Sequence, residues 1–141
     1  DTGLLVAHTF ADRPETPHEV YRAILFDKLE INEGMFTENV VAQQLRASGR
    51  RLFFYSASDR NESRNTMEVD FLIVREYADA GLKPRVSPIE VKSTKRYRTV
   101  SLDKFKRKFD KRVGTRYVLH PKPLSADGDL VRLPLYMAYL L

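Results

Sequence analysis

Apolar positions recur at helical spacing in the first third of the chain. Thr16 and Glu19 have the spacing of a capping box, and the apolar residues after them predict a helix over 17–29. A second predicted helix runs from Glu33 to Ala47 and ends near Gly49, a residue that readily adopts the left-handed conformation of a helix cap.

The middle of the chain has the pattern of strands. Short apolar or alternating runs predict strands over 52–55, 67–74 and 85–93, separated by a polar hairpin loop over 59–66 and a turn over 79–81. Pro88 lacks a backbone N–H donor, so it suggests an edge strand or the beginning of a strand.

The pattern returns to helical spacing after the third strand. Leu102, Phe105, Phe109 and Val113 form an apolar seam that predicts an amphipathic helix between Ser101 and Gly114. Further predicted elements are a strand over 117–119, a turn at 127–128 leading into 130–133, and a short terminal helix over 134–141. The order ααβββαβ with a C-terminal tail indicates a layered α/β domain.

Length and composition fit one domain over residues 1–141. The 43% hydrophobic content is sufficient for a core, and the absence of cysteine favours a reducing, cytoplasmic location. The sequence contains neither a signal peptide nor an apolar run long enough for a membrane span. Because the chain opens without Met, we expect it to be part of a longer polypeptide. A homo-oligomer is compatible with the sequence.

The net charge of +5 is concentrated between residues 92 and 112, which contain ten basic and two acidic residues. Such a stripe is typical of contact with a phosphate backbone, although a solvated helix face is an equal alternative on charge alone. The candidate nucleic-acid contacts are Lys95, Arg96, Arg98, Lys104, Arg107, Lys108 and Lys111.

Charged residues interrupt three apolar elements. Glu38 lies within the apolar arc of the second helix, Asp70 lies in the second strand, and Glu90 and Lys92 share one face of the third. If these two strands pair, facing side chains stand about 5 Å apart, so Asp70 and Glu90 can bind one cation. The alternative is a structural ion-pair network, and for Glu38 alone a salt bridge to a lysine is favoured.

Oxygen ligands without cysteine or paired histidines suit Mg²⁺ or Mn²⁺. Such a metal polarises a phosphodiester and acidifies a bound water, and Lys92 would orient or stabilise that water. His8, His18 and His120 are assigned no ligand role. Tyr97 and Tyr117 are candidates for base stacking, but no platform for a single strand is evident.

Asp70, followed by Glu90-Val91-Lys92 and preceded by helical Glu38, resembles the PD-(D/E)XK nuclease motif. More narrowly, the chain resembles an uncharacterised domain at the C-terminus of bacterial and archaeal AAA-type ATPases. The words that carry this second resemblance are Asn32-Glu33-Gly34, Glu38-Asn39-Val40-Val41, Glu68-Val69-Asp70-Phe71, Ile89-Glu90-Val91-Lys92-Ser93 and Leu133-Pro134-Leu135-Tyr136.

The resemblance implies a restriction-endonuclease-like fold, with a small mixed central sheet flanked by helices. It also implies that Glu38, Asp70 and Glu90 bind the metal and that Lys92 is the catalytic lysine, with Glu68 as a further ligand or a partner of one. The ATPase module would lie upstream, and this chain has no G-x-x-x-x-G-K loop, so no ATP site is expected on it.

Three functions remain open from the sequence. The first is a metal-dependent nuclease acting on DNA. The second is a nucleic-acid-binding module without catalysis. The third is a protein-interaction or regulatory domain of the ATPase.

Overall fold

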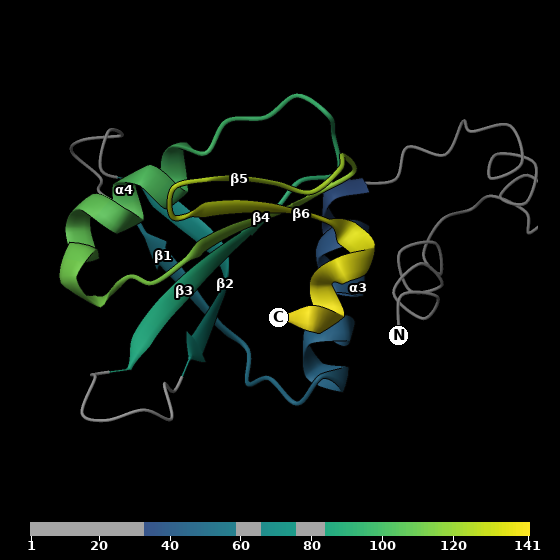
Figure 1. Ribbon diagram of the computed structural model, residues 1–141, viewed down its shortest axis with the longest axis horizontal. Coiled ribbons are helices and arrows are strands. Elements are labelled where there is room, and N and C mark those ends of the chain that lie inside the picture. The colour runs from purple at the N-terminus through teal and green to yellow at the C-terminus, as the bar shows by residue number, and fades with distance from the viewer. Residues whose placement is uncertain (1–32, 59–65, 76–83) are drawn as a thin grey trace, which may run out of the picture.

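The computed structural model describes residues 33–58, 66–75 and 84–141 and is built around a six-stranded mixed sheet (Figure 1). The elements are α3 (Glu33–Ala47), β1 (Phe53–Ala57), β2 (Met67–Arg75), β3 (Arg85–Val91), α4 (Val100–Phe109), the 3₁₀ helix η2 (Asp110–Arg112), β4 (Arg116–His120), β5 (Ser125–Asp127), β6 (Leu130–Pro134) and the 3₁₀ helix η3 (Leu135–Leu140).

The strands are ordered β1-β2-β3-β4-β6-β5 across the sheet. The pairs β1–β2, β2–β3 and β5–β6 are antiparallel, whereas β3–β4 and β4–β6 are parallel. A parallel pair needs a crossover connection, and α4 supplies it between β3 and β4. The predicted α/β layered architecture is therefore confirmed.

Helices cover both faces of the sheet. On one face α3 and η3 lie side by side (Figure 1), and on the other α4 packs against β2 and β3. The α3-side core consists of Val41, Leu45, Ile73, Ile89, Val91, Tyr117, Leu119, Leu133, Ala138 and Leu141. The α4-side core consists of Met67, Val69, Leu102, Phe105, Val113, Val118 and Leu130.

The predicted second helix is confirmed as α3, with the expected bounds. Val41 and Leu45 are four residues apart and are both buried, as an amphipathic helix requires. Gly49 follows the helix with φ 85°, which confirms its role in the cap. The apolar arc that the sequence predicts for this helix includes Met35, but Met35 is 37% exposed, so the buried stripe begins further along the helix.

The basic helix is confirmed as α4, but both of its predicted ends are wrong. Thr99, rather than Ser101, is the N-cap residue, and its side chain makes no capping hydrogen bond. Gly114 is not a helix cap. Its N–H donates to the Val86 carbonyl at 2.9 Å, and an added Cβ would lie 3.2 Å from Ser87 Oγ. Gly114 therefore allows a close approach of the chain to β3.

Pro88 lies within a central strand, so the prediction of an edge strand is wrong. It is fully buried, and it is opposite Leu72 of β2. Regular pairing with β4 begins only at the next residue, Ile89, opposite Tyr117. A proline is tolerated here because the parallel ladder has not yet begun.

The C-terminal tail is more regular than the sequence pattern predicted. The expected turn leads from β5 into β6, with Gly128 at φ 58°, and β6 joins the sheet beside β4. Strand β5 was not predicted because its three residues are all exposed and carry no apolar signal. The terminal helix is confirmed as a 3₁₀ helix.

The helix predicted over 17–29, the turn over 79–81 and most of the polar loop over 59–66 lie outside the described residues. In the described part of the chain, none of the helices has the length and apolar character needed to cross a membrane.

A network of ion pairs joins α4 to the end of the β5–β6 hairpin. Arg116, which is 8% exposed, donates to Asp103 and, through Nε and Nη2, to Asp129 at 2.9 and 3.1 Å. Lys106 Nζ also reaches Asp129 at 2.9 Å. These hydrogen bonds hold the pKa of Asp129 at about 2, below its ordinary value of 3.8.

Asp129→Asn should therefore lower the free energy of unfolding at pH 7 by about 1 kcal/mol, a value reduced for the partial exposure of Asp129. Because the folded-state pKa is depressed, this stabilisation is present above pH 3.8 and is lost as pH falls towards 2. Urea denaturation at several pH values measures it. Asp127→Asn, on exposed β5, is the control, and equal losses of stability in both variants would contradict the network's role.

Candidate functional site

β2 bulges at the position of Asp70. Tyr55 of β1 is opposite Val69, whereas Phe53, two residues earlier in β1, is opposite Leu72, three residues later in β2. One strand therefore has an extra residue, and such a bulge breaks the alternation of faces.

The bulge changes which side chains share a face. Met67 and Val69 belong to the α4-side core, whereas Ile73 belongs to the α3-side core and Phe71 packs against it. Regular alternation along the strand predicts that these four side chains share one face. That prediction is wrong, because an extra residue reverses the faces beyond Asp70.

The ladder between β2 and β3 also ends at this point. Its last pair in this direction is Phe71 opposite Ile89. At the next position, where Asp70 and Glu90 would be opposite each other, no ladder pair forms. Instead, Oδ2 of Asp70 accepts a hydrogen bond of 2.7 Å from the N–H of Val91. A side-chain carboxylate thus replaces a main-chain acceptor where the two strands separate.

Glu90 and Lys92 flank Val91 on the opposite face of β3. Glu90 is 6% exposed, and its Oε1 lies 2.7 Å from Lys92 Nζ. The other oxygen, Oε2, is buried without a hydrogen-bond partner. A buried carboxylate oxygen without a partner is costly, so Oε2 is a candidate position for contact with a ligand.

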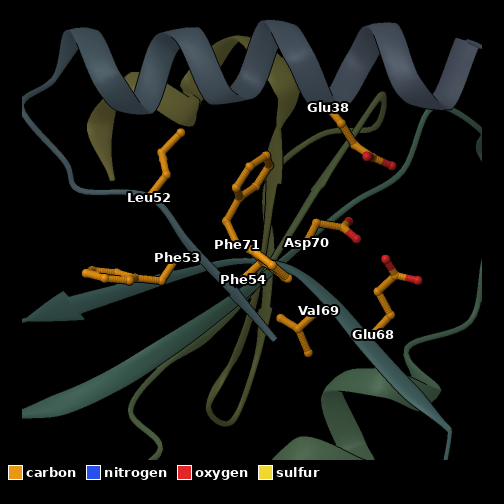
Figure 2. Close-up of a pocket in the computed structure, with 8 residues that line it drawn as sticks. All are labelled: Glu38, Leu52, Phe53, Phe54, Glu68, Val69, Asp70 and Phe71. Carbon is orange, nitrogen blue, oxygen red and sulfur yellow. The ribbon is translucent and has the colours of Figure 1, made fainter. Parts of the chain in front are cut away.

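Glu38 and Glu68 bring two more carboxylates to the region of Asp70. Figure 2 shows Glu38 pointing down from α3 and Glu68 and Asp70 pointing from β2 into a common space. These acids line a hollow of about 270 Å³ whose other walls are Leu52, Phe53, Phe54, Val69 and Phe71. The structure therefore brings the sequence-predicted acids of α3 and β2 together.

The electrostatic environment penalises negative charge at three of the acids. Burial is the main cause that raises the pKa of Glu38, Asp70 and Glu90. Mutual repulsion adds to it, since Asp70 raises the pKa of both Glu38 and Glu90. Lys92 lowers all three pKa values but does not offset the other effects. Burial and mutual repulsion together thus outweigh the effect of Lys92 on the pKa of all three acids.

Asp70 and Glu90, the two predicted metal ligands on neighbouring strands, each have a contact within the chain. Asp70 bonds the N–H of Val91 and Glu90 pairs with Lys92. Among residues 33–58, 66–75 and 84–141, no group of three acidic or histidine side chains is placed to hold a metal ion. By their chemistry the residues do fit a hard divalent cation, because they offer only carboxylate oxygens, one of them buried and unsatisfied.

Most of the predicted nucleic-acid contacts are exposed. Lys104 is half-buried and donates to the Thr66 carbonyl at 2.9 Å, and Lys108 Nζ donates to Tyr55 Oη at 3.0 Å. These two lysines therefore tie α4 to the sheet. Within the described part of the chain, no ion pair joins the remaining predicted contacts to a carboxylate. They are Lys95, Arg96, Arg98, Arg107 and Lys111.

The sequence did not reveal a pair formed by half-buried Tyr97 and buried His120. The Tyr97 hydroxyl lies 2.8 Å from His120 Nδ1, and the two rings meet edge to face. His120 is 2% exposed. No local spacing could have found this pair, because the two residues are 23 positions apart in the chain, with α4 between them.

A family of domains of unknown function, DUF4143, matches residues 33–136. The match begins at the first residue of α3 and ends within η3, so it includes every candidate metal ligand. Comparison with curated proteins and with solved structures gave no match.

Asp70→Asn should stabilise the fold at neutral pH, since asparagine keeps an acceptor for the N–H of Val91 and removes the buried charge. Because the folded-state pKa is raised, ionised Asp70 destabilises the fold above that pKa, and the penalty disappears as pH falls through it. We expect a gain on the order of 1 kcal/mol, measured by urea denaturation with EDTA. Asp127→Asn should show no gain, and destabilisation by Asp70→Asn would indicate that the charge itself is structural.

Proposed function

The chain belongs to the DUF4143 family, domains of unknown function often found in AAA-ATPase-associated proteins, and from its site we propose that it is a metal-dependent nuclease domain acting on DNA. The observation that carries the proposal is the buried, unpartnered Oε2 of Glu90. Burial disfavours the charged form of Glu90, as it does at Asp70 and Glu38, and raises the pKa of all three acids. A divalent cation supplies what this arrangement lacks.

The topology supports membership of the PD-(D/E)XK superfamily. From α3 to β4 the elements follow the order αβββαβ, with β1, β2 and β3 antiparallel and β4 parallel to β3. Asp70 and Glu90 lie on neighbouring strands where these strands separate, and Lys92 follows two residues later.

Asp70, Glu90 and Glu38 would hold Mg²⁺ or Mn²⁺. When bound, such an ion acidifies water and offsets the charge that develops on a phosphodiester. The N–H of Val91 fixes one Asp70 oxygen, which leaves the second available to a ligand. Lys92 keeps 28% of its side chain exposed while it contacts Glu90, so its ammonium can donate to an attacking water or a phosphate oxygen.

DNA is the proposed substrate because exposed basic side chains follow β3 and Lys92 directly in the chain. The segment after Lys92 carries Lys95, Arg96 and Arg98. Further along the chain, α4 adds Arg107 and η2 adds Lys111, and all five are exposed. Five cations free of ion pairs in the described residues can each neutralise a backbone phosphate. The upstream ATPase of the same polypeptide is the partner that the family resemblance suggests.

A second candidate is a module that binds nucleic acid without cutting it. Among the described residues, no three acidic or histidine side chains are placed to hold a metal ion, which favours this alternative. Lys92 contacts one oxygen of Glu90, and the N–H of Val91 donates to one oxygen of Asp70. On this alternative the basic face alone serves the ATPase. A purely regulatory role would require neither the metal nor the DNA.

Metal binding and cleavage test the proposal together. Calorimetric titration with Mn²⁺ should show at least tenfold weaker binding for Asp70→Asn and Glu90→Gln, because each variant lacks one charged ligand. Lys92→Met should keep binding within about threefold yet lower the rate of plasmid nicking by about 100-fold, since it removes only the group that orients water.

Asp127→Asn, an exposed carboxylate on the far edge strand β5, is the matched control and should behave like the wild type in both assays. Absence of Mn²⁺ binding at millimolar concentration would contradict the proposal that the domain is a metal-dependent nuclease. Nicking that persists in Lys92→Met would remove the lysine from the mechanism while leaving the metal site intact.

The basic face makes a separate prediction. Arg107→Gln combined with Lys111→Gln should weaken duplex binding about tenfold and reduce the slope of log K against log salt by about two, one for each phosphate that the variant no longer neutralises. Arg46→Gln combined with Arg51→Gln removes equal charge from α3 and the segment after it. Fluorescence anisotropy at several salt concentrations measures duplex affinity. If both double variants bind the duplex equally weakly, binding depends on net charge alone.

A further inference from the structure

A second hollow, of about 500 Å³, opens at the carboxyl ends of β4 and β6. It is lined by His120 and Lys122, by Leu135 and Tyr136, and by three prolines. The carboxyl ends of parallel strands are where open α/β sheets commonly bind ligands. None of these residues belongs to the acidic hollow.

His120 supplies this hollow with a buried polar atom that has no partner. Its Nδ1 contacts the Tyr97 hydroxyl at 2.8 Å, while Nε2 is buried without a hydrogen-bond partner. Burial is the main cause that lowers the pKa of His120. The backbone of Pro123 opposes this effect, and the charges of Lys122 and Arg132 lower the pKa further, which favours the neutral ring. When Tyr97 donates to Nδ1, Nε2 carries the proton and can donate to a ligand.

The rest of the lining suits a flat apolar ring attached to a negative charge. Tyr136 is 72% exposed and offers an aromatic face, and the prolines add apolar walls. Lys122 is exposed and Arg132 is half-buried, and both lie close enough to His120 to affect its pKa. Cations beside an apolar hollow favour a ligand that carries phosphate.

The hollow lies beside the end of β3, where Lys92 follows the strand. Lys92 N–H donates to the Leu119 carbonyl at 2.8 Å, so Lys92 and His120 are neighbours across the β3–β4 pair. Adjacent strands are about 4.8 Å apart, a separation that one nucleotide spans easily. A strand whose phosphate lies at Lys92 can therefore place an adjacent base at His120.

We propose that the hollow between β4 and η3 is a subsite for one unpaired nucleobase of the DNA strand, an assignment that rests on the proposed function. The base stacks on Tyr136, and a ring nitrogen or carbonyl oxygen of the base accepts a hydrogen bond from His120 Nε2. Lys122 and Arg132 attract the phosphates on either side. Every base has an aromatic face and such an acceptor, so the subsite selects unpaired strands without selecting a sequence.

The test compares three 12-nucleotide ligands with the full chain in EDTA, so that no cleavage occurs: a single strand, the same strand as a duplex, and an abasic strand of equal charge. Wild type should bind the single strand at least tenfold more tightly than the abasic strand. Tyr136→Ala should bind the single strand about tenfold more weakly, because it cannot stack on a base, and should leave duplex affinity unchanged. His120→Phe, which keeps the ring and removes both nitrogens, should bind the single strand about fivefold more weakly.

Tyr139→Ala is the matched control, since this tyrosine is 57% exposed on the same 3₁₀ helix and does not line the hollow. Tyr136 is a surface side chain, so its replacement keeps the result interpretable even if His120→Phe disturbs folding. Equal affinity of wild type for the intact and abasic strands, or equal weakening in Tyr136→Ala and Tyr139→Ala, would overturn the subsite. Metal-dependent nicking and duplex binding that persist in that case would leave the proposed function standing, whereas failure to bind any of the three ligands would overturn both.

Discussion

The hydrogen bond from the N–H of Val91 to the Asp70 carboxylate sets the arrangement of the whole site. It forms where the β2–β3 ladder ends and where the bulge of β2 reverses its faces. A main-chain pair at this position would continue the ladder. The carboxylate instead lets the strands separate, and the separation opens space for Glu38 and Glu68 beside Asp70 (Figure 2).

The sequence predicted those parts of the fold that depend on local pattern. The bounds of α3 follow from its apolar spacing and Gly49, and the seam of Leu102 and Phe105 predicts the buried side of α4. Pairing across the sheet was less accessible. Pro88 is tolerated centrally only because β4 begins to pair one residue later, and β5 exists only because β6 offers it an edge.

The candidate acids were found because charge is rare in apolar strands, and the structure brings Glu38, Glu68 and Asp70 together. Their contacts could not be predicted. Strict alternation required Asp70 to face Glu90 directly, and a single extra residue in β2 directs it to the N–H of Val91 instead. The Tyr97–His120 pair could not be predicted for a related reason, since only the fold brings those two residues together.

Two sets of acidic residues in this molecule show opposite electrostatics. Asp129 accepts hydrogen bonds from Arg116 and Lys106, and its pKa falls to about 2, as expected of an acid whose charge stabilises the fold. At Asp70 and Glu90 burial raises the pKa, although Lys92 is present. An acid set that served only stability would gain from a second cation or from neutral replacements. The buried carboxylates and the unsatisfied Glu90 oxygen are therefore the basis of the proposal that a cation binds at this site.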